Sequence, residues 1–240
     1  MKKEEGEEVK DCIVIQKKIF RVRPITKVVV MYDYDGTVAD TMPAHADLAG
    51  ACINTHFGMS IPEAREEYLN TAGIPFDCQL EKIFPQSTSL QREACVKEYY
   101  ERKMTYVYGN PKEFPQVAKV IKRLRNHPNI IQIISSSTEE NIINEWVKKT
   151  GNDVYMVLGR ESGSKIDHIS KIKENIPGAV IVFVSDSHGD MSLPADMTFG
   201  VNVPTDKNAI FLDSGAAIVS RKPVCLVWAE YCFGKIGLMV

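Results

Sequence analysis

The sequence predicts an α/β protein built on a doubly wound, Rossmann-like parallel sheet, and two observations support this prediction. Short apolar runs that resemble buried strands alternate along the chain with amphipathic patterns that resemble helices. The strand-like runs are apolar throughout, which is typical of strands that helices cover on both faces. With 240 residues, the chain is long enough for one large domain or two smaller ones.

The predicted elements follow one another in the order that such a sheet requires. Four strand-like runs are found, at 27–32, 130–134, 154–158 and 180–184. Three helical patterns lie among them, at 116–126, about 137–151 and 165–176. The second of these helices is predicted to begin with the capping pattern S-T-E-E at Ser137 and to end at Gly151.

The stretch from 42 to 111 interrupts this alternation. It has no convincing strand but several helical patterns, one of which starts at Thr88 with the capping pattern T-S-L-Q. The stretch is too long for a loop between a strand and a helix, so we expect a helical insertion with its own small core. The predicted division is an N-terminal extension at 1–24, a sheet-containing core at 25–41 and 112–240, and a helical domain at 42–111. Two further runs near the ends, at 13–22 and 223–228, resemble additional strands.

Composition and charge argue against several classes of protein. The formal net charge of -2 offers no general attraction to nucleic acid or to an anionic membrane, so we expect neither partner. The six cysteines are scattered without a C-x-x-C pair, which is typical of reduced thiols in a cytosolic protein. No run approaches the roughly 20 apolar residues of a membrane span, and the charged N-terminal segment does not resemble a signal peptide. We therefore expect a cytoplasmic protein that binds a small molecule, with the oligomeric state left open.

Polar side chains follow the predicted strands at positions that a parallel sheet would bring to one edge. Asp33 and Asp35 follow the first run, and Ser135 follows the second. Asp186 and Asp190 follow the fourth run. Clustered carboxylates repel one another unless they share a cation, and oxygen ligands beside a phosphate suit Mg²⁺. The sequence therefore predicts a Mg²⁺ site at this edge of the sheet.

These positions resemble the four motifs of the haloacid dehalogenase-like (HAD) hydrolases. The segment VVVMYDYDGTVAD resembles the first motif, a strand followed by D-x-D-G-T, and Ser135 resembles the second. Lys165 in GSKIDHI resembles the third motif, and VFVSDSHGDM, with Asp186 and Asp190, resembles the fourth. An insertion after the first motif is where the family's C1-type helical cap lies. The resemblance implies a HAD core with a cap, in the branch of the phosphoglycolate phosphatases and β-phosphoglucomutases.

The resemblance and the chemistry of the side chains together imply a role for each residue. Asp33 is the predicted nucleophile that forms an aspartyl-phosphate, and Asp35 is the predicted acid and base. The groups expected to bind the phosphate are Gly36, Thr37, Ser135, Ser136 and Lys165. The expected Mg²⁺ ligands are Asp33, Asp35, Asp186 and Asp190.

The choice among three consecutive serines stays open in the sequence. Ser135, Ser136 and Ser137 all follow the second strand, and one of them is expected to cap the next helix. We favour Ser135 as the phosphate-binding hydroxyl because it directly follows the apolar run.

The third and fourth motifs also depart from the usual family pattern. Lys165 competes with Lys171 and Lys173, which we interpret as solvated helix positions. No proline follows Lys165, and Ser185 stands where the family usually has glycine. Neither change removes a chemical group that the reaction needs.

The sequence therefore predicts a Mg²⁺-dependent enzyme that hydrolyses a small phosphate monoester. Asp35 favours phosphoryl transfer over dehalogenation, because the family's dehalogenases lack a carboxylate acid–base group at that position. Two alternatives stay open: a sugar phosphomutase, which uses the same four motifs, and a catalytically silent binding protein on the same scaffold.

Overall fold

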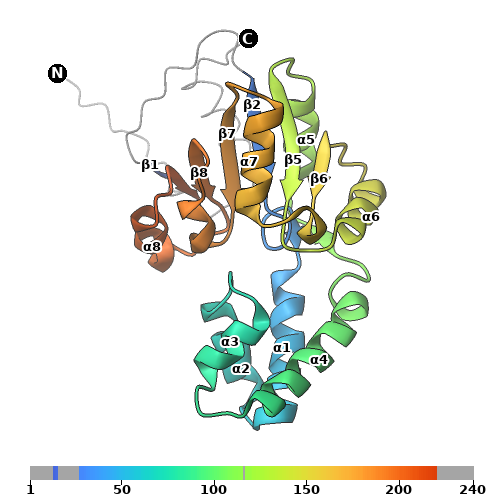
Figure 1. Ribbon diagram of the computed structural model, residues 1–240, viewed down its shortest axis with the longest axis vertical. Helices are drawn as coiled ribbons and strands as arrows, with labels where there is room; N and C mark the ends of the chain where they lie inside the picture. Colours follow the sequence, from blue (N-terminus) through green and yellow to red (C-terminus); the bar gives the residue numbers. More distant parts are fainter. Residues whose placement is uncertain (1–12, 16–26, 116, 221–240) are drawn as a thin grey trace, which may run out of the picture.

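The computed structural model describes residues 13–15, 27–115 and 117–220 of the protein. The described chain forms two lobes (Figure 1). A sheet with helices on both faces makes the upper lobe of that view, and four helices make the lower one. We call the lower lobe, residues 42–106, the helical lobe.

A seven-stranded sheet lies at the centre of the upper lobe, with the strand order β1-β9-β8-β7-β2-β5-β6. Its strands are β1 (Ile13–Ile15), β2 (Val28–Tyr32), β5 (Ile130–Ser135), β6 (Met156–Leu158), β7 (Val180–Ser185), β8 (Met197–Gly200) and β9 (Ile218–Ser220). Every pairing is parallel except that of β1 with β9. This topology confirms the predicted doubly wound α/β fold, in which the four predicted strand runs are β2, β5, β6 and β7.

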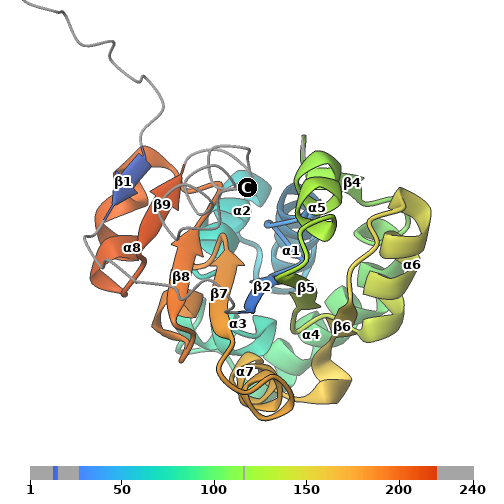
Figure 2. The ribbon, with the colours of Figure 1, turned by 90° about the horizontal axis from the view of Figure 1, so that it is seen from above.

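Helices cover both faces of the sheet (Figure 2). Helices α5 (Val117–Arg125) and α6 (Glu140–Thr150) pack on one face, and α7 (Lys165–Asn175) packs on the other. Successive side chains of a strand point to opposite faces, so Val30 and Tyr32 of β2 pack with α5 and α6, whereas Val29 and Met31 pack with α7. Because both faces are buried, β2 is a continuous apolar run in the sequence. Helix α8 (Asn208–Asp213) contacts β9 towards one edge of the sheet.

The helical lobe contains α1 (Met42–Phe57), α2 (Ile61–Asn70), α3 (Phe76–Ile83) and α4 (Ser89–Tyr106). The chain enters and leaves it through a short antiparallel pair, β3 (Ala39–Asp40) and β4 (Lys112–Glu113). Both connections therefore lie side by side, close to the carboxyl end of β2. Three 3-10 turns complete the described elements: η1 (Arg160–Ser162), η2 (His188–Ser192) and η3 (Thr205–Lys207).

The sequence prediction is right about the residue that caps α4 and wrong about the residue that caps α6. Thr88 does cap α4, since its side chain accepts the backbone N–H of Gln91 at 3.2 Å. The side chain of Gln91 donates to the His56 carbonyl instead of completing the capping box. The prediction that Ser137 caps α6 is wrong: this helix starts after Glu139 and has no side-chain cap.

Helix α7 has the complete capping box that the sequence analysis missed. The Ser164 hydroxyl accepts the N–H of Asp167, and the Asp167 carboxylate accepts the N–H of Ser164. These two bonds fix the first turn of α7, which begins with Lys165.

The predicted terminal strands are only partly covered by the described residues. β1 occupies Ile13–Ile15 of the run at 13–22, and the rest of that run and the run at 223–228 lie outside the described residues. Within the described ranges, no helix combines the length and the apolar character that crossing a bilayer requires.

Candidate active site

Asp33 is the first residue after β2 and lies at the carboxyl edge of the sheet. Its backbone N–H donates to the Val184 carbonyl of β7 at 2.9 Å. One carboxylate oxygen accepts the N–H of Tyr34 at 2.8 Å, and the other lies 2.9 Å from Nζ of Lys165. Asp33 is only 7% exposed. This burial raises the pKa of Asp33 to about 6, and the charge of Lys165 limits the rise.

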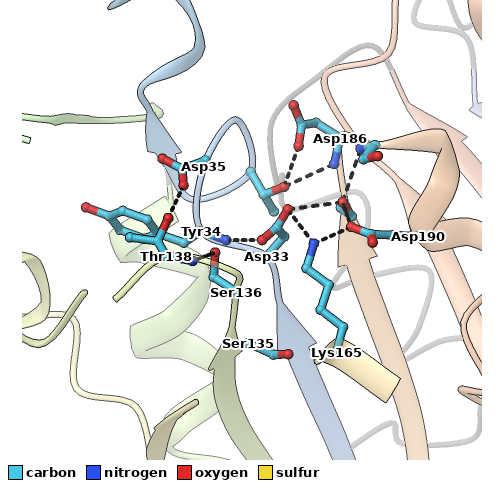
Figure 3. A network of polar contacts seen from close by, with 12 residues as sticks. Asp33, Tyr34, Asp35, Ser135, Ser136, Thr138, Lys165, Asp186 and Asp190 are labelled. Carbon is cyan, nitrogen blue, oxygen red and sulfur yellow. Dashed lines mark hydrogen bonds and ion pairs between the residues drawn. The ribbon is translucent and has the colours of Figure 1, made fainter. Parts of the chain in front are cut away.

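Lys165 connects two of the predicted aspartates. Its ammonium group points between Asp33 and Asp190, at 2.9 and 2.6 Å (Figure 3). Burial alone would lower the pKa of Lys165, but the two carboxylates raise it above its ordinary value. The hydroxyl of Ser185 also donates to Asp190 at 2.6 Å. Ser185, which stands where glycine was expected, thus helps to position the carboxylate of Asp190 beside Lys165.

Asp186 lies on the loop after β7 and contacts the loop after β2. Its carboxylate accepts the Thr37 hydroxyl at 3.2 Å, and its N–H donates to the same hydroxyl oxygen at 3.0 Å. Burial, together with the charge of Asp33, raises the pKa of Asp186 to about 8. A Cβ on Gly36 would lie 2.0 Å from Oδ2 of Asp186, so any larger residue at position 36 would displace this carboxylate.

The four predicted metal ligands do not gather their side chains around one point. Lys165 lies between Asp33 and Asp190, and Asp35 turns towards the helical lobe. Across the described ranges, no group of three or more carboxylate, imidazole or thiol side chains is placed to hold a metal ion. Asp33 and Asp186 are neighbouring carboxylates whose pKa values are raised by burial. An all-oxygen pair of this kind fits a hard divalent cation such as Mg²⁺.

Asp35 forms hydrogen bonds with the helical lobe, with the segments that connect this lobe to the sheet, and with Thr138 in the loop after β5. Its carboxylate accepts the hydroxyls of Thr41 and Thr138, each at 2.6 Å, and that of Tyr108 at 3.1 Å. Nε2 of His45 lies 3.3 Å from Oδ1. Burial alone would raise the pKa of Asp35. The hydrogen bond from His45 and the charge of that ring when protonated, together with the hydrogen bonds from Thr138 and Thr41, outweigh burial and hold the pKa well below its usual range.

The two serines that follow β5 point in different directions. The Ser135 hydroxyl lies 2.9 Å from Nδ1 of His168, and in Figure 3 it points away from the aspartates. Ser136 lies between Asp33 and Thr138 in the same view, and its hydroxyl oxygen accepts the Thr138 N–H at 3.3 Å. This geometry contradicts the preference for Ser135 as the phosphate-facing hydroxyl, and Ser136 is the one of the two that lies on the side of Asp33. Successive residues at a strand end point to opposite sides, so only one of the two can face the site.

Four partners of Asp35 were not predicted as site residues from the sequence. Thr41, His45, Tyr108 and Thr138 lie 6, 10, 73 and 103 residues after it in the chain. For Tyr108 and Thr138, the sequence holds no pattern that reveals the contact. His45 follows Thr41 by four residues, and this helical spacing would have placed both side chains on one face of α1.

The helical lobe also contacts the loop after β7. Gly73, in the connection between α2 and α3, has a φ of +103°. A Cβ at this position would lie 2.6 Å from the hydroxyl oxygen of Ser187, the residue after Asp186. The helical lobe therefore reaches the edge of the sheet at a second point, besides the contacts of Asp35.

Several known structures have the same fold as this protein. Similar structures include a haloacid dehalogenase-like family hydrolase from Streptococcus pneumoniae (15% identity, 85% of this chain and 98% of that chain, TM-score 0.68). A hydrolase from Pseudomonas syringae is also similar (17% identity, 85% and 97% covered, TM-score 0.65). So is a predicted phosphoglycolate phosphatase from Haemophilus somnus (13% identity, 80% and 93% covered, TM-score 0.63). At these identities, the likeness shows the fold alone.

Comparison of the sequence identifies the family. No curated protein sequence matches the chain. The family profile of the haloacid dehalogenase-like hydrolases matches residues 30–192, which is more than half of the chain and includes all four motifs. The protein belongs to the haloacid dehalogenase-like hydrolase family.

Proposed function

We propose that this hydrolase is a phosphatase that cleaves a small phosphate monoester through an aspartyl-phosphate on Asp33. The observation that carries the proposal is the buried carboxylate of Asp33, 2.9 Å from the ammonium group of Lys165 at the carboxyl edge of the sheet. Such a carboxylate can attack phosphorus while the cation balances the charge of the phosphoryl group. With a pKa of about 6, Asp33 is mostly ionised at neutral pH, as a nucleophile must be.

The proposed reaction has two halves. In the first, an oxygen of Asp33 attacks phosphorus, the bond from phosphorus to the alcohol oxygen breaks, and that oxygen takes a proton from Asp35. In the second, Asp35 takes a proton from water, and the resulting hydroxide attacks phosphorus to release phosphate and Asp33. The donors around Asp35 favour its carboxylate form, which the second half needs. We expect substrate to displace one of these donors when Asp35 takes up the proton for the first half.

Mg²⁺ is the proposed cofactor, held by the side chains of Asp33 and Asp186 and by the backbone carbonyl of Asp35. When bound, it would reduce the repulsion between Asp33 and the phosphate. The raised pKa of Asp186 supports this assignment, because that buried carboxylate accepts a hydrogen bond from the neutral Thr37 and has the negative charge of Asp33 nearby. Asp190 is proposed to act through Lys165, with which it pairs at 2.6 Å.

The phosphate is proposed to lie beside Ser136 and Lys165, which would donate from their side chains. The backbone N–H groups of Gly36 and Thr37, which the sequence also predicted as phosphate donors, instead donate to the carbonyls of Ala39 and Tyr34 at 2.9 and 3.4 Å. Gly36 has a φ of +72°, a conformation that glycine adopts without strain. The helical lobe would act as a cap that closes over these donors.

Phosphoprotein trapping and phosphate release would test the proposal. Wild-type enzyme with Mg²⁺ should release phosphate from at least one member of a broad panel of phosphate monoesters, and a chelator should stop the release. Asp33→Asn should form no phosphoenzyme. Asp35→Asn should form it from nitrophenyl phosphate, whose leaving group needs little protonation, and should hydrolyse it slowly. Asp213→Asn, an exposed substitution on α8, is the matched control and should behave as wild type.

The same experiment separates the alternatives. Absence of phosphate release from every ester at high enzyme concentration would favour a binding protein. Turnover that depends on a sugar bisphosphate and releases no net phosphate would favour a mutase. A phosphoenzyme in Asp33→Asn would place the nucleophile elsewhere.

A further inference from the structure

Asn202, in the loop after β8, is the only described residue other than glycine with a positive φ, at +57°. The backbone is held firmly on both sides of it. The N–H of Val201 donates to the Ser185 carbonyl at 3.0 Å, which continues the pairing of β8 with β7. The N–H of Val203 donates to the Ser220 carbonyl of β9, also at 3.0 Å. A left-handed residue with a side chain costs free energy, and such residues gather at functional sites.

The side chain of Asn202 reaches the loop after β2. Its Nδ2 donates to the Gly36 carbonyl at 2.6 Å. A carbonyl only accepts, so the NH₂ group of the amide, and not its oxygen, must face Gly36. Gly36 is buried, and its own N–H donates to the Ala39 carbonyl at 2.9 Å. The backbone of Gly36 is therefore held through its N–H by its own loop and through its carbonyl by Asn202.

Gly36 in turn limits where the carboxylate of Asp186 can lie. A Cβ on Gly36 would be 2.0 Å from Oδ2 of Asp186, so the Cα atom, one bond away, already lies in contact with that carboxylate. The next residue, Thr37, bonds Asp186 through its hydroxyl, at 3.2 Å from the carboxylate and 3.0 Å from the backbone nitrogen. A shift of the Gly36 backbone would therefore displace the carboxylate of Asp186.

We infer that Asn202 is a positioning residue for the proposed Mg²⁺ site. By holding the Gly36 carbonyl, it keeps the turn at Gly36 and Thr37 against Asp186 and so fixes the direction of that carboxylate. The inference rests on the proposed function, because it takes Asp186 to be a ligand of Mg²⁺. It adds the loop after β8 to the loops after β2 and β7 that build the site.

Two substitutions separate the amide from the backbone conformation. Asn202→Gly removes the amide and keeps the loop, because glycine adopts a positive φ without strain. Asn202→Ala also removes the amide but leaves a Cβ in the left-handed conformation. Both variants should lose the same Mg²⁺ affinity, and Asn202→Ala should unfold at a lower temperature than Asn202→Gly.

The first measurement is thermal unfolding of the full chain at increasing concentrations of Mg²⁺, which needs no activity. A ligand that binds the folded state raises the unfolding temperature, and the concentration dependence gives its dissociation constant. This constant should rise about 3- to 10-fold in both variants, the worth of one hydrogen bond. Asp186→Asn removes a proposed ligand and marks the part of the response that belongs to this site. Unchanged affinity in Asn202→Gly, or a loss confined to Asn202→Ala, would overturn the inference.

Asn54→Ala is the matched control. Nδ2 of Asn54 donates to the Met59 carbonyl at 2.8 Å, so this variant loses the same kind of bond at an exposed position in the helical lobe. Its Mg²⁺ affinity should equal that of wild type. If wild type and Asp186→Asn respond equally to Mg²⁺, the proposed metal site is wrong and the inference falls with it. If wild type responds more than Asp186→Asn and Asn202→Gly matches wild type, only the inference falls.

The second measurement is phosphate release, at a series of Mg²⁺ concentrations, from an ester that the wild type hydrolyses. In Asn202→Gly, the Mg²⁺ concentration for half-maximal rate should rise by the same factor of about 3 to 10, and excess Mg²⁺ should restore most of the rate. General damage to the fold would lower the rate at every Mg²⁺ concentration, and a loss that Mg²⁺ does not restore would contradict the inference. An inactive wild type would count against the proposed function, and the unfolding measurement would then decide the inference.

Discussion

The hydroxyl of Ser135 lies 2.9 Å from Nδ1 of His168, a fully buried histidine on α7. Nε2 of His168 lies 3.1 Å from the Gly159 carbonyl, which only accepts, so Nε2 carries the ring proton and Nδ1 accepts the Ser135 hydroxyl. His168 follows Lys165 by three residues on the same helix. The hydrogen bond between Ser135 and His168 therefore connects the end of β5 to α7, the helix that carries Lys165.

The contact between Ser135 and His168 predicts that the two neighbouring serines matter for different properties: Ser135 for stability and Ser136 for kcat. Ser135→Ala should lower the free energy of unfolding by about 1–3 kcal/mol, because it leaves a buried acceptor on His168 without its donor. It should change kcat little. Ser136→Ala should lower kcat by about 10²- to 10³-fold, as the loss of a donor to the phosphoryl group does in other enzymes. Urea unfolding and steady-state kinetics on both variants measure the two effects, and a larger kcat loss in Ser135→Ala would contradict the orientation described.

His168 also predicts a loss of stability in mild acid. Burial lowers the pKa of His168 from its ordinary value of 6.5. Between the folded and the unfolded pKa, the unfolded chain binds more protons than the folded chain, so the free energy of unfolding falls as the pH falls. The contribution of His168 is complete above pH 6.5 and is lost below it, with a slope of at most about 1.4 kcal/mol per pH unit. Urea unfolding from pH 8 to pH 5 should show a steeper decline in wild type than in His168→Gln. Equal slopes would contradict the prediction.

The elements that the sequence predicts well are those whose burial leaves a continuous pattern. β2, β5 and β7 are covered on both faces, so nearly all of their residues are apolar and the runs are easily recognised. β8 and β9 have four and three residues, and β8 contains Thr198, so neither forms a recognisable run. They are strands because β7 offers β8 a hydrogen-bonding edge and β8 then offers one to β9, which is a tertiary effect.

Prediction of the site residues from the sequence is limited in the same way, because part of the site also depends on tertiary packing. Parallel strands bring their carboxyl ends to one edge, so the meeting of Asp33 with Lys165 and Asp190 follows from the order of the elements. The choice between Ser135 and Ser136 depends on the strand's register, and a difference of one residue reverses the face. The contact of Tyr108 with Asp35 depends on how the chain packs where it leaves the helical lobe, which no local pattern encodes.

Lys165→Met should disable the enzyme and shift its pH dependence. The variant removes the cation that limits the pKa of Asp33, so that pKa should rise above its present value of about 6. Because the nucleophile must be ionised, the acidic limb of the kcat/KM profile should move to higher pH. A kcat loss of at least about 10²-fold is expected from the lost charge. Lys171→Met, an exposed change on the same helix, is the control, and an unshifted acidic limb in Lys165→Met would show that Lys165 does not set the pKa of Asp33.

Gly73→Ala should weaken the contact between the helical lobe and the loop that carries Asp186. The new Cβ would lie 2.6 Å from the Ser187 hydroxyl oxygen, so the two loops would have to separate or the serine would have to turn. The φ of +103° adds backbone strain for any residue but glycine. We expect a lower kcat/KM together with a lower free energy of unfolding, measured by steady-state kinetics and urea unfolding.

Gly58→Ala is the control that separates the effect of the contact with Ser187 from the effect of backbone strain at a positive φ. Gly58 also has a positive φ, +71°, but a Cβ there would meet nothing within 4 Å. Its substitution should cost about 1–2 kcal/mol of stability, the penalty for a left-handed alanine, and should leave kcat/KM unchanged. If the two variants lose similar stability and only Gly73→Ala loses activity, the lost activity comes from the approach to Ser187. Equal activity in both variants would mean that the enzyme works without this contact.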